Sequence, residues 1–247
     1  MEISCVIPAF ESADLVRRCL RSAIAQSEVA LEIIVSDDSV STEIRGLVAT
    51  FPTIRYVEGA RSGNPVDNWN HGLAAAQAPL AVLMHQDEAF ADPLFLRRAV
   101  DAMRPDGVAA VVGTTRVTGV NRTSRFALAS ALFRRAPARL WWLPMINWVG
   151  PTAALVFRNG VRFDPALVQL VDIDFYRRVL ATGRLVRLDW ICVDSLGHHG
   201  ASITARIDPA ARARADLAVM AARSPPGIGR VQHRLALAML AARGWRG

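Results

Sequence analysis

The sequence contains no lysine, since all 29 basic residues of this 247-residue chain are arginine. Every mechanism that needs a lysine is therefore excluded. Two glycine-rich phosphate-binding patterns are also missing, the G-x-G-x-x-G of dinucleotide binders and the G-x-x-x-x-G-K-[ST] of phosphate-loop proteins. The sequence thus lacks the phosphate-binding motifs usual in dehydrogenases, methyltransferases and ATPases, which disfavours these classes. A bound diphosphate would need another partner, such as a metal ion held by carboxylates.

Cysteine is scarce, and no long apolar run is uninterrupted. Cys5, Cys19 and Cys192 are too few and too irregularly spaced for a disulfide framework or a zinc site, so we expect reduced, partly buried thiols in a cytosolic protein. The longest uncharged run, residues 140–157, is interrupted by proline, asparagine and glycine, which favours a loop entering a buried strand over a transmembrane helix. The N-terminus does not have the pattern of a signal peptide.

Charge is unevenly distributed along the chain. Residues 204–247 hold eight arginines against two aspartates, a net +6, whereas residues 1–203 hold 21 arginines against 20 acidic residues, a net +1. We therefore expect no nucleic-acid-binding surface on the body. The Ala/Arg-rich tail, predicted to form two helices broken at "SPPGIG", either contacts anionic membrane lipid or packs on the body or on a second subunit in a homodimer.

Short apolar runs alternate with helical patterns over the first hundred residues. The runs "ISCVIPAF", "LEIIVSDDS", "IRYVEG" and "LAVLMHQ" predict strands, and the segments between them have the spacing of amphipathic helices. This alternation is typical of an α/β protein with a parallel sheet covered by helices on both faces. The second half is less regular, with strands expected in "GVAAVVGTTRVTG" and "GPTAALVFRNG" and a helix in "VDIDFYRRVLATG".

Three of the predicted strands end in acidic groups, "PAFES", "SDDSVS" and "HQDEAF". Ligands of such sheets bind beyond the carboxyl ends of the strands, where these groups would share one rim. This rim suits a divalent cation and the uncharged edges of a base and sugars. The alternatives are a solvated turn at "HQDEAF" and helix capping by "SDDSVS". The acidic residues expected on the rim are Glu11, Asp37, Asp38, Asp87 and Glu88.

Several segments together resemble, in order, the family 2 glycosyltransferases, which are inverting, nucleotide-sugar-dependent enzymes with a GT-A fold. The resemblance spans about residues 3–204 and implies a Rossmann-like mixed sheet flanked by helices. We therefore expect a GT-A domain over residues 1–204 and a basic helical extension over 205–247. The segments are "SCVIPAFESADLVRRCLRSAIAQ", "LEIIVSDDSVSTE", "NWNHGLAAAQAPLAVLMHQDEAF", "INWVGPTAALVFR", "LVDIDFYRRVLATG" and "HHGAS".

The resemblance implies a nucleotide site in the first half of the chain. The carboxylate of Asp38 is expected to accept a hydrogen bond from the N3–H of a pyrimidine, which favours a UDP- or dTDP-sugar. The other residues expected to bind the nucleotide are Pro8, Phe10, Glu11, Asp37, Asn70 and Asp87.

The resemblance also implies a metal site for Mg²⁺ or Mn²⁺. Asp87 and Glu88 occupy the motif in which the family usually has two aspartates, and hard oxygen ligands of this kind suit either ion. Because Glu88 is longer than aspartate, direct and water-mediated contact with the metal are both open. His199, in a His-x-x-Ser sequence, is expected to approach the metal or the diphosphate.

Asp172 matches the catalytic base of the family, which would take the proton of an acceptor hydroxyl. The alternative is that it simply favours a helix N-terminus. Arg178 matches a basic residue at fixed spacing from the base, although an ordinary ion pair would also explain it. The segment that contains Trp148, Gly150 and Thr152 matches the acceptor-facing part of the family, although the tryptophan could belong to the core.

These expectations describe an inverting transferase of the hexosyl or deoxyhexosyl class that passes a sugar to a saccharide or lipid-linked hydroxyl. It would act in cell-surface polysaccharide synthesis, in the cytoplasm or at the inner face of the membrane. The Gln-x-x-Arg-Trp signature of processive synthases is missing, so we expect one transfer per encounter. The alternative is a non-catalytic sugar-nucleotide-binding or scaffold protein on the same fold.

Overall fold

The structure, a computed structural model, describes residues 1–59, 61–118, 143, 147–196, 209–223, 231–232 and 235–236. The chain divides into two compact units. The first comprises Met1–Thr118, Val149–Arg162 and Val179–Gly197, and the second comprises Gly119–Trp148, Phe163–Arg178 and His198–Gly247. The predicted boundary at residue 204 lies outside the described residues and stays a prediction.

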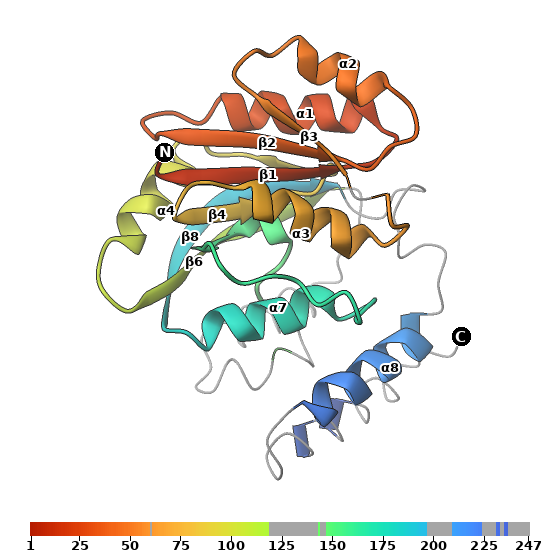
Figure 1. Cartoon of the computed structure of the whole chain (residues 1–247). Coiled ribbons are helices and arrows are strands. Elements are labelled where there is room, and N and C mark those ends of the chain that lie inside the picture. Colours follow the sequence, from red (N-terminus) through yellow and green to blue (C-terminus); the bar gives the residue numbers. More distant parts are fainter. Residues whose placement is uncertain are drawn as a thin grey trace. The chain divides into compact units, whose positions relative to one another are not determined.

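The helices and strands follow the alternation that the sequence predicts for the first half of the chain (Figure 1). In chain order they are β1 (Ile3–Ala9), α1 (Ala13–Ile24), β2 (Leu31–Asp37), α2 (Glu43–Ala49), β3 (Arg55–Glu58), α3 (Pro65–Ala75), β4 (Leu80–Leu83), β5 (Glu88–Phe90), α4 (Phe95–Met103), β6 (Val108–Thr118), the 3₁₀ helix η1 (Thr152–Ala154), β7 (Leu155–Arg158), α7 (Val171–Leu180), β8 (Arg184–Leu196) and α8 (Pro209–Ala222).

Burial explains the composition of the central elements. All seven residues of β1 are buried, because helices cover both faces of the sheet there and a strand buried on both faces needs an almost continuous apolar run. Helix α1 instead buries only one stripe at helical spacing, formed by Val16, Cys19, Leu20 and Ala23. All three cysteines of the chain are free, as predicted, and they are buried rather than partly buried.

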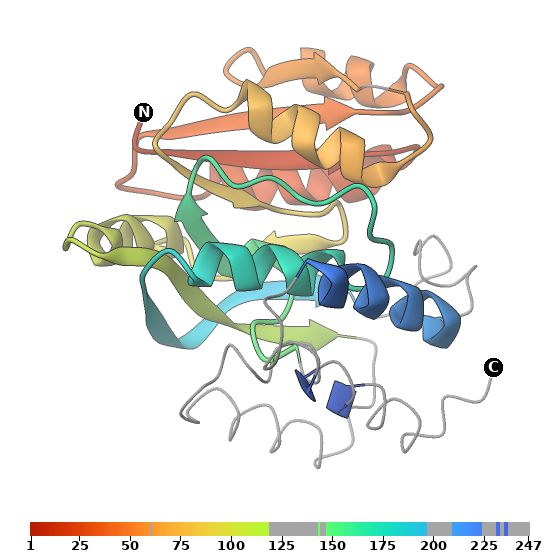
Figure 2. The same cartoon turned by 60° about the horizontal axis from the view of Figure 1, so that its bottom comes forward.

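Among the described residues of the first unit, eight strands form one sheet in the order β3-β2-β1-β4-β7-β6-β8-β5. Strands β1 to β4 pair in parallel, as predicted, but β7 enters antiparallel between β4 and β6, which makes the sheet mixed. Helices α1 and α2 lie on one face and α3 on the other (Figures 1 and 2). The chain therefore reverses its direction of winding between β1 and β4, and sheets of this kind bind ligands beyond the strand ends at that point.

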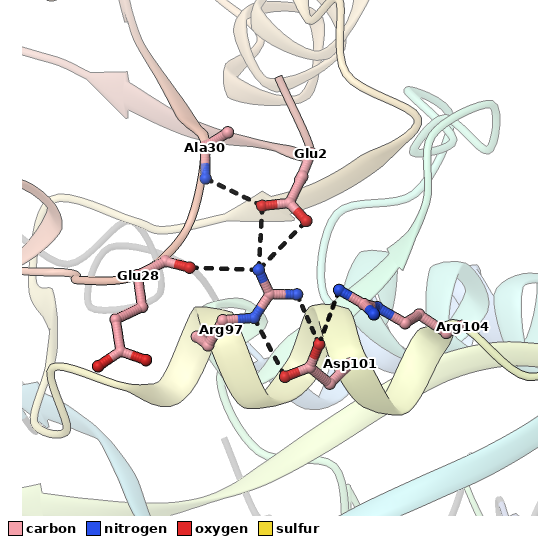
Figure 3. A network of polar contacts seen from close by, with 6 residues as sticks. All are labelled: Glu2, Glu28, Ala30, Arg97, Asp101 and Arg104. Atoms are coloured by element: carbon pink, nitrogen blue, oxygen red, sulfur yellow. Dashed lines mark hydrogen bonds and ion pairs between the residues drawn. The ribbon is translucent and has the colours of Figure 1, made fainter.

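Helix α4 is joined by hydrogen bonds to the amino ends of β1 and β2, the ends opposite to those where a ligand is expected. The guanidinium of Arg97 donates to both carboxylate oxygens of Glu2 at 3.1 Å and to the carbonyl of Glu28 at 3.2 Å (Figure 3). It also forms two hydrogen bonds with Asp101 one turn along the helix, at 2.7 and 3.1 Å. Glu2 in turn accepts from the backbone N–H of Ala30 at 3.1 Å. The starts of β1 and β2 are thus tied to α4, away from their carboxyl ends.

In the second unit, the rings of Phe163 and Phe175 stack with centroids 3.9 Å apart, which packs the segment before α7 against that helix. Among the residues that the structure describes, no helix is both long and apolar enough to cross a membrane.

Candidate functional site

The carboxyl ends of β1, β2 and β4 are joined by hydrogen bonds between their loops. The backbone N–H of Phe10 donates to the side-chain carbonyl of Gln86 at 2.9 Å, and the N–H of Asp38 donates to the carbonyl of Ala9 at 3.0 Å. Pro8 lies within buried β1, whereas Phe10 is 56% exposed. An exposed aromatic ring thus stands at the rim, on a loop held from two sides.

Asp37 is buried, with 1% of its surface exposed. One carboxylate oxygen accepts from the backbone N–H of Ser39 and the other from the phenol of Tyr56, each at 3.0 Å. Its carbonyl accepts from the N–H of Gly59 at 2.7 Å. Burial raises the pKa of Tyr56 and the hydrogen bond to Asp37 raises it further, so the phenol keeps its proton and donates. Asp37 therefore holds the loop after β2 in place through its hydrogen bonds.

Asp38 is only half-buried. Its Oδ1 accepts from the backbone N–H of Arg61 at 2.6 Å. A Cβ at Gly59 would lie 2.7 Å from this oxygen and 2.9 Å from the side-chain oxygen of Asn68, closer than real contacts allow. The absence of a side chain at position 59 thus makes room for the carboxylate of this half-buried residue, which accepts from a backbone N–H.

Asn68, which the sequence analysis missed, joins α3 to the strand ends. It is 4% exposed, and its amide donates to the carbonyls of Ser36 at 3.0 Å and Ala9 at 3.4 Å. Its oxygen accepts from the Ser36 hydroxyl at 2.6 Å. One turn later, a Cβ at Gly72 would lie 2.6 Å from Val6. The four-residue spacing of a buried polar residue and a glycine was the signal that this face of α3 lies directly on the sheet.

Glu11 secures the same loop from the β1 side. Its backbone has a positive φ of 48°, and its N–H donates to the Ser39 hydroxyl at 2.8 Å. Its carboxylate accepts from the backbone N–H groups of Val40 at 2.6 Å and Ser41 at 3.3 Å. The hydrogen bond from Val40, followed by those from Ser41, lowers the pKa of Glu11. Glu11 therefore lies on the predicted rim, where it binds protein backbone.

In the second acidic pair, Asp87 and Glu88, one residue is again buried and the other half-buried. Glu88 opens β5 and is 3% exposed. Its Oε2 accepts from the backbone N–H of His85 at 2.8 Å, from the N–H of Ala153 at 3.3 Å and from the hydroxyl of Thr152 at 3.4 Å. The neighbouring Asp87 is half-buried. The turn after β4 thus directs Glu88 into the protein, where it holds η1.

Residues of α1 and α3 hold the turn that carries Asp87 and Glu88. The Cys19 thiol of α1 donates to the carbonyls of Glu88 at 3.0 Å and His85 at 3.3 Å. Burial, together with the nearby charge of Glu88, raises the pKa of Cys19 well above its ordinary value, so the thiol stays a donor. The ring of His85 meets Trp69 of α3 edge-on, with centroids 4.7 Å apart. Packing therefore determines the shape of the turn.

The donor chemistry of this turn fits a magnesium or manganese ion. Mg²⁺ is usually held by one or two carboxylates together with the phosphates of a substrate, and Asp87 offers such a carboxylate at the rim. Among the described residues, no group of three or more histidine, cysteine or acidic side chains could hold a metal unaided. Within the described part of the chain, a metal here would therefore need further ligand atoms besides Asp87, and the third predicted ligand, His199, lies outside the described residues.

The remaining predicted residues are placed as follows. Asn70 is half-buried on α3. Gly150 precedes η1 with φ 98°, and Trp148 is fully buried. In the second unit, Asp172 is half-buried in the first turn of α7. Arg178, whose side chain is 41% exposed, forms an ion pair with Asp174 at 2.7 Å.

Comparison with solved structures defines the fold as GT-A type. The mannosyltransferase PcManGT from Pyrobaculum calidifontis, in complex with GDP-Man and Mn²⁺, has a TM-score of 0.68 at 17% identity, covering 98% of this chain and 73% of that chain. S. aureus TarS 1–349 in complex with UDP-GlcNAc has a TM-score of 0.67 at 15% identity, covering 98% and 72%. At this identity the likeness concerns the fold alone.

The sequence comparison gives the family. The chain belongs to glycosyl transferase family 2, whose model matches residues 4–158, more than half of the chain. It is also similar to the succinoglycan biosynthesis protein ExoU of Rhizobium meliloti (strain 1021), with 26% identity over 216 residues, 77% of this chain and 60% of that protein. The chain spans 39% to 61% of the length of the curated relatives that it matches. The resemblance noted from the sequence is thereby confirmed.

Proposed function

We propose that this chain is an inverting, non-processive glycosyltransferase that takes a sugar from a nucleoside-diphosphate sugar and depends on a divalent cation. The observation that carries the proposal is the pair of half-buried carboxylates, Asp38 and Asp87, in loops at the carboxyl ends of β2 and β4. These strands flank β1, where the sheet changes its direction of winding and where ligands of such folds bind.

The nucleotide is assigned to the loops after β1 and β2. Asp38 accepts the imide N–H of a uracil or thymine, which favours a UDP- or dTDP-sugar, while Asp37, Glu11 and Asn68 hold the backbone around it. Phe10 offers an exposed ring for the base or ribose. Pro8 and Asn70 complete the proposed nucleotide site. Support for a nucleotide sugar as donor also comes from PcManGT and TarS, whose structures contain GDP-Man and UDP-GlcNAc.

The metal is assigned to Asp87, with His199 as a second ligand. When bound, Mg²⁺ or Mn²⁺ would neutralise the charge that develops on the departing nucleoside diphosphate. The Mn²⁺ in the PcManGT complex supports this part of the proposal. Glu88 has a different task, because its Oε2 already accepts three hydrogen bonds. It keeps the Asp87 turn in place and links it to η1.

Asp172 is assigned as the base. Its carboxylate takes the proton of an acceptor hydroxyl as the oxygen forms a bond to the anomeric carbon, and the bond from that carbon to the diphosphate breaks on the opposite side, which inverts the centre. Because Trp148 is buried and Thr152 donates to Glu88, we give both a supporting role. Gly150 and Arg178 are then the residues proposed to face the acceptor or the diphosphate.

The acceptor is proposed to be a saccharide or a lipid-linked saccharide of a polysaccharide pathway, acted on at the cytoplasmic side of the membrane. The similarity to ExoU, a succinoglycan biosynthesis protein, supports this class of acceptor.

A ligand panel tests the proposal. Purified chain is melted with UDP-glucose, UDP-GlcNAc, a dTDP-sugar and GDP-mannose, each with and without Mn²⁺, and donor hydrolysis is then measured. A ligand present at a hundred times its dissociation constant stabilises a fold by about 2.7 kcal/mol, so one nucleotide class should raise the melting temperature by several degrees, only when Mn²⁺ is present. No stabilisation and no hydrolysis with any of the four donors would contradict the proposal.

A further inference from the structure

A buried carboxylate from α8 holds the backbone that leads into α7. Asp216 is 2% exposed, and its oxygens accept from three consecutive N–H groups: that of Val168 at 3.0 and 3.1 Å, that of Gln169 at 2.6 Å and that of Leu170 at 2.7 Å. All these residues belong to the second unit, and Figure 2 shows α8 next to the start of α7.

This arrangement is a complete anion-binding turn in which the anion is part of the chain. Successive backbone N–H groups that converge form a concavity for negative charge, and a carboxylate at the N-terminal end of a helix also meets the positive end of its dipole. The first helical hydrogen bond of α7 runs from Asp174 to the carbonyl of Leu170 at 3.0 Å. Asp216 therefore fixes the backbone conformation at Leu170, directly before α7 starts. Leu170 precedes Asp172 by two residues.

A second contact holds the other end of the same segment. Arg223, just beyond the end of α8, forms an ion pair with Asp164, and Asp164 accepts from the N–H of Ala166 at 3.0 Å. The side of α8 that carries Asp216 is mostly apolar and buried, while Arg214 on the other side is exposed. Its buried apolar residues are Ala213, Leu217 and Met220.

We propose that Asp216 is a positioning residue for Asp172, so that α8 takes part in catalysis by keeping the first turn of α7 in its working conformation. The inference rests on the proposed function, because it takes Asp172 to be the base. It also gives the basic C-terminal segment a task that its charge does not reveal, since the residue that matters is one of its two aspartates.

Hydrogen exchange measured by mass spectrometry on the full chain tests the geometry without any substrate. In Asp216→Ala, the amides of residues 168–170 should exchange at least about ten times faster than in the wild type, because their acceptor is gone, and the amides of residues 171–174 should also exchange faster as the first turn of α7 loosens. Asp216→Asn, which keeps one acceptor oxygen, should lie between the two. Arg214→Ala on the exposed side of α8 is the matched control and should leave these amides unchanged. Unchanged exchange in Asp216→Ala would overturn the inference.

Hydrolysis of UDP-GlcNAc and GDP-mannose with Mn²⁺ tests the consequence. For the donor that the wild type hydrolyses, kcat per folded molecule should fall about 10- to 100-fold in Asp216→Asn, while the donor KM stays within about twofold. A lower melting temperature with wild-type kcat would mean a structural role only and would overturn the inference.

Asp172→Asn separates the two proposals. If it hydrolyses donor as fast as the wild type, the assignment of the base fails, whatever Asp216 does. If Asp172→Asn is inactive and Asp216→Asn has the kcat of the wild type, the positioning role alone fails. If the wild type hydrolyses neither donor, the proposed function loses support, and the exchange rates decide whether Asp216 organises the start of α7.

Discussion

Each of the two acidic pairs at the rim of the sheet has one buried and one half-buried residue, but the order along the chain is opposite in the two pairs. In the pair at the end of β2, the first residue, Asp37, is buried and the second, Asp38, is half-buried. In the pair at the start of β5, the first residue, Asp87, is half-buried and the second, Glu88, is buried. In both pairs the buried carboxylate accepts hydrogen bonds from nearby N–H or O–H groups.

The difference shows that the position of a carboxylate within such a pair, first or second, does not decide whether it is buried in the protein or left half-buried at the rim. Neighbouring side chains along an extended backbone point to opposite sides, so two adjacent acids need not share a ligand. In each pair the buried member is the one that belongs to a strand: β2 continues through Asp37, whereas β5 begins with Glu88. The buried member holds its loop through hydrogen bonds, and we propose that the other member binds a ligand.

The largest effect is expected for Asp87→Asn. Removing the carboxylate assigned to the metal takes away several kcal/mol of stabilisation of the developing charge, so donor turnover should fall by about 100-fold or more, since each 1.36 kcal/mol is a factor of ten. The melting temperature without ligand should stay within about 2 °C of the wild type. Turnover assays with Mn²⁺ and thermal melts measure both. Wild-type turnover in this variant would remove Asp87 from the metal site.

Glu88→Gln should show the reverse pattern. The amide keeps one acceptor oxygen but loses the charge that strengthens the hydrogen bonds from His85 and η1, which should lower the free energy of unfolding by about 2 kcal/mol. Urea denaturation measures this loss. Glu88→Asp, which keeps the charge on a shorter side chain, is the matched comparison. Unaltered stability in Glu88→Gln would show that the buried carboxylate does not hold the turn.

Much of this architecture is predictable because local pattern and fold agree in β1 to β4. Strand–helix alternation predicts the parallel half of the sheet and brings both acidic pairs to its carboxyl edge. Which member of each pair turns inward is not predictable, because it depends on distant partners such as Tyr56 and Thr152. The antiparallel entry of β7 between β4 and β6 is equally non-local. Asp216 was hidden because the arginines around it dominate the composition of the segment.

A smaller effect is expected from the pair after β2. Asp38→Asn should weaken binding of the preferred nucleotide diphosphate by about tenfold, as expected for the loss of one charged hydrogen bond, with little change in stability. Asp37→Asn should lower the free energy of unfolding by about 1 kcal/mol, because its amide no longer accepts from both Ser39 and Tyr56 as a charged group. Isothermal titration and urea denaturation, run on both variants, measure the two quantities. Identical profiles for the two variants would contradict the division of roles.

The smallest effect concerns acid stability at Glu11. Hydrogen bonds from Val40 and Ser41 hold its pKa below the ordinary value of 4.5. A carboxyl whose pKa is lower in the folded state contributes stability that is present above the unfolded pKa and is lost as pH falls through the folded pKa. The stability difference between the wild type and Glu11→Gln should therefore be constant above about pH 5 and shrink below about pH 4.5. Denaturation curves from pH 3 to 7 measure it, and a difference that does not depend on pH would contradict this role.

Titration of Mn²⁺ into the Asp87→Asn and Glu88→Gln variants, each saturated with the nucleoside diphosphate that stabilises the wild type, tests the division of roles most directly. At a temperature where both variants are folded, Glu88→Gln should bind Mn²⁺ within about tenfold of the wild-type affinity, as expected for a residue that supports a ligand. Asp87→Asn should show no saturable binding. Loss of Mn²⁺ binding in folded Glu88→Gln as complete as in Asp87→Asn would contradict the account.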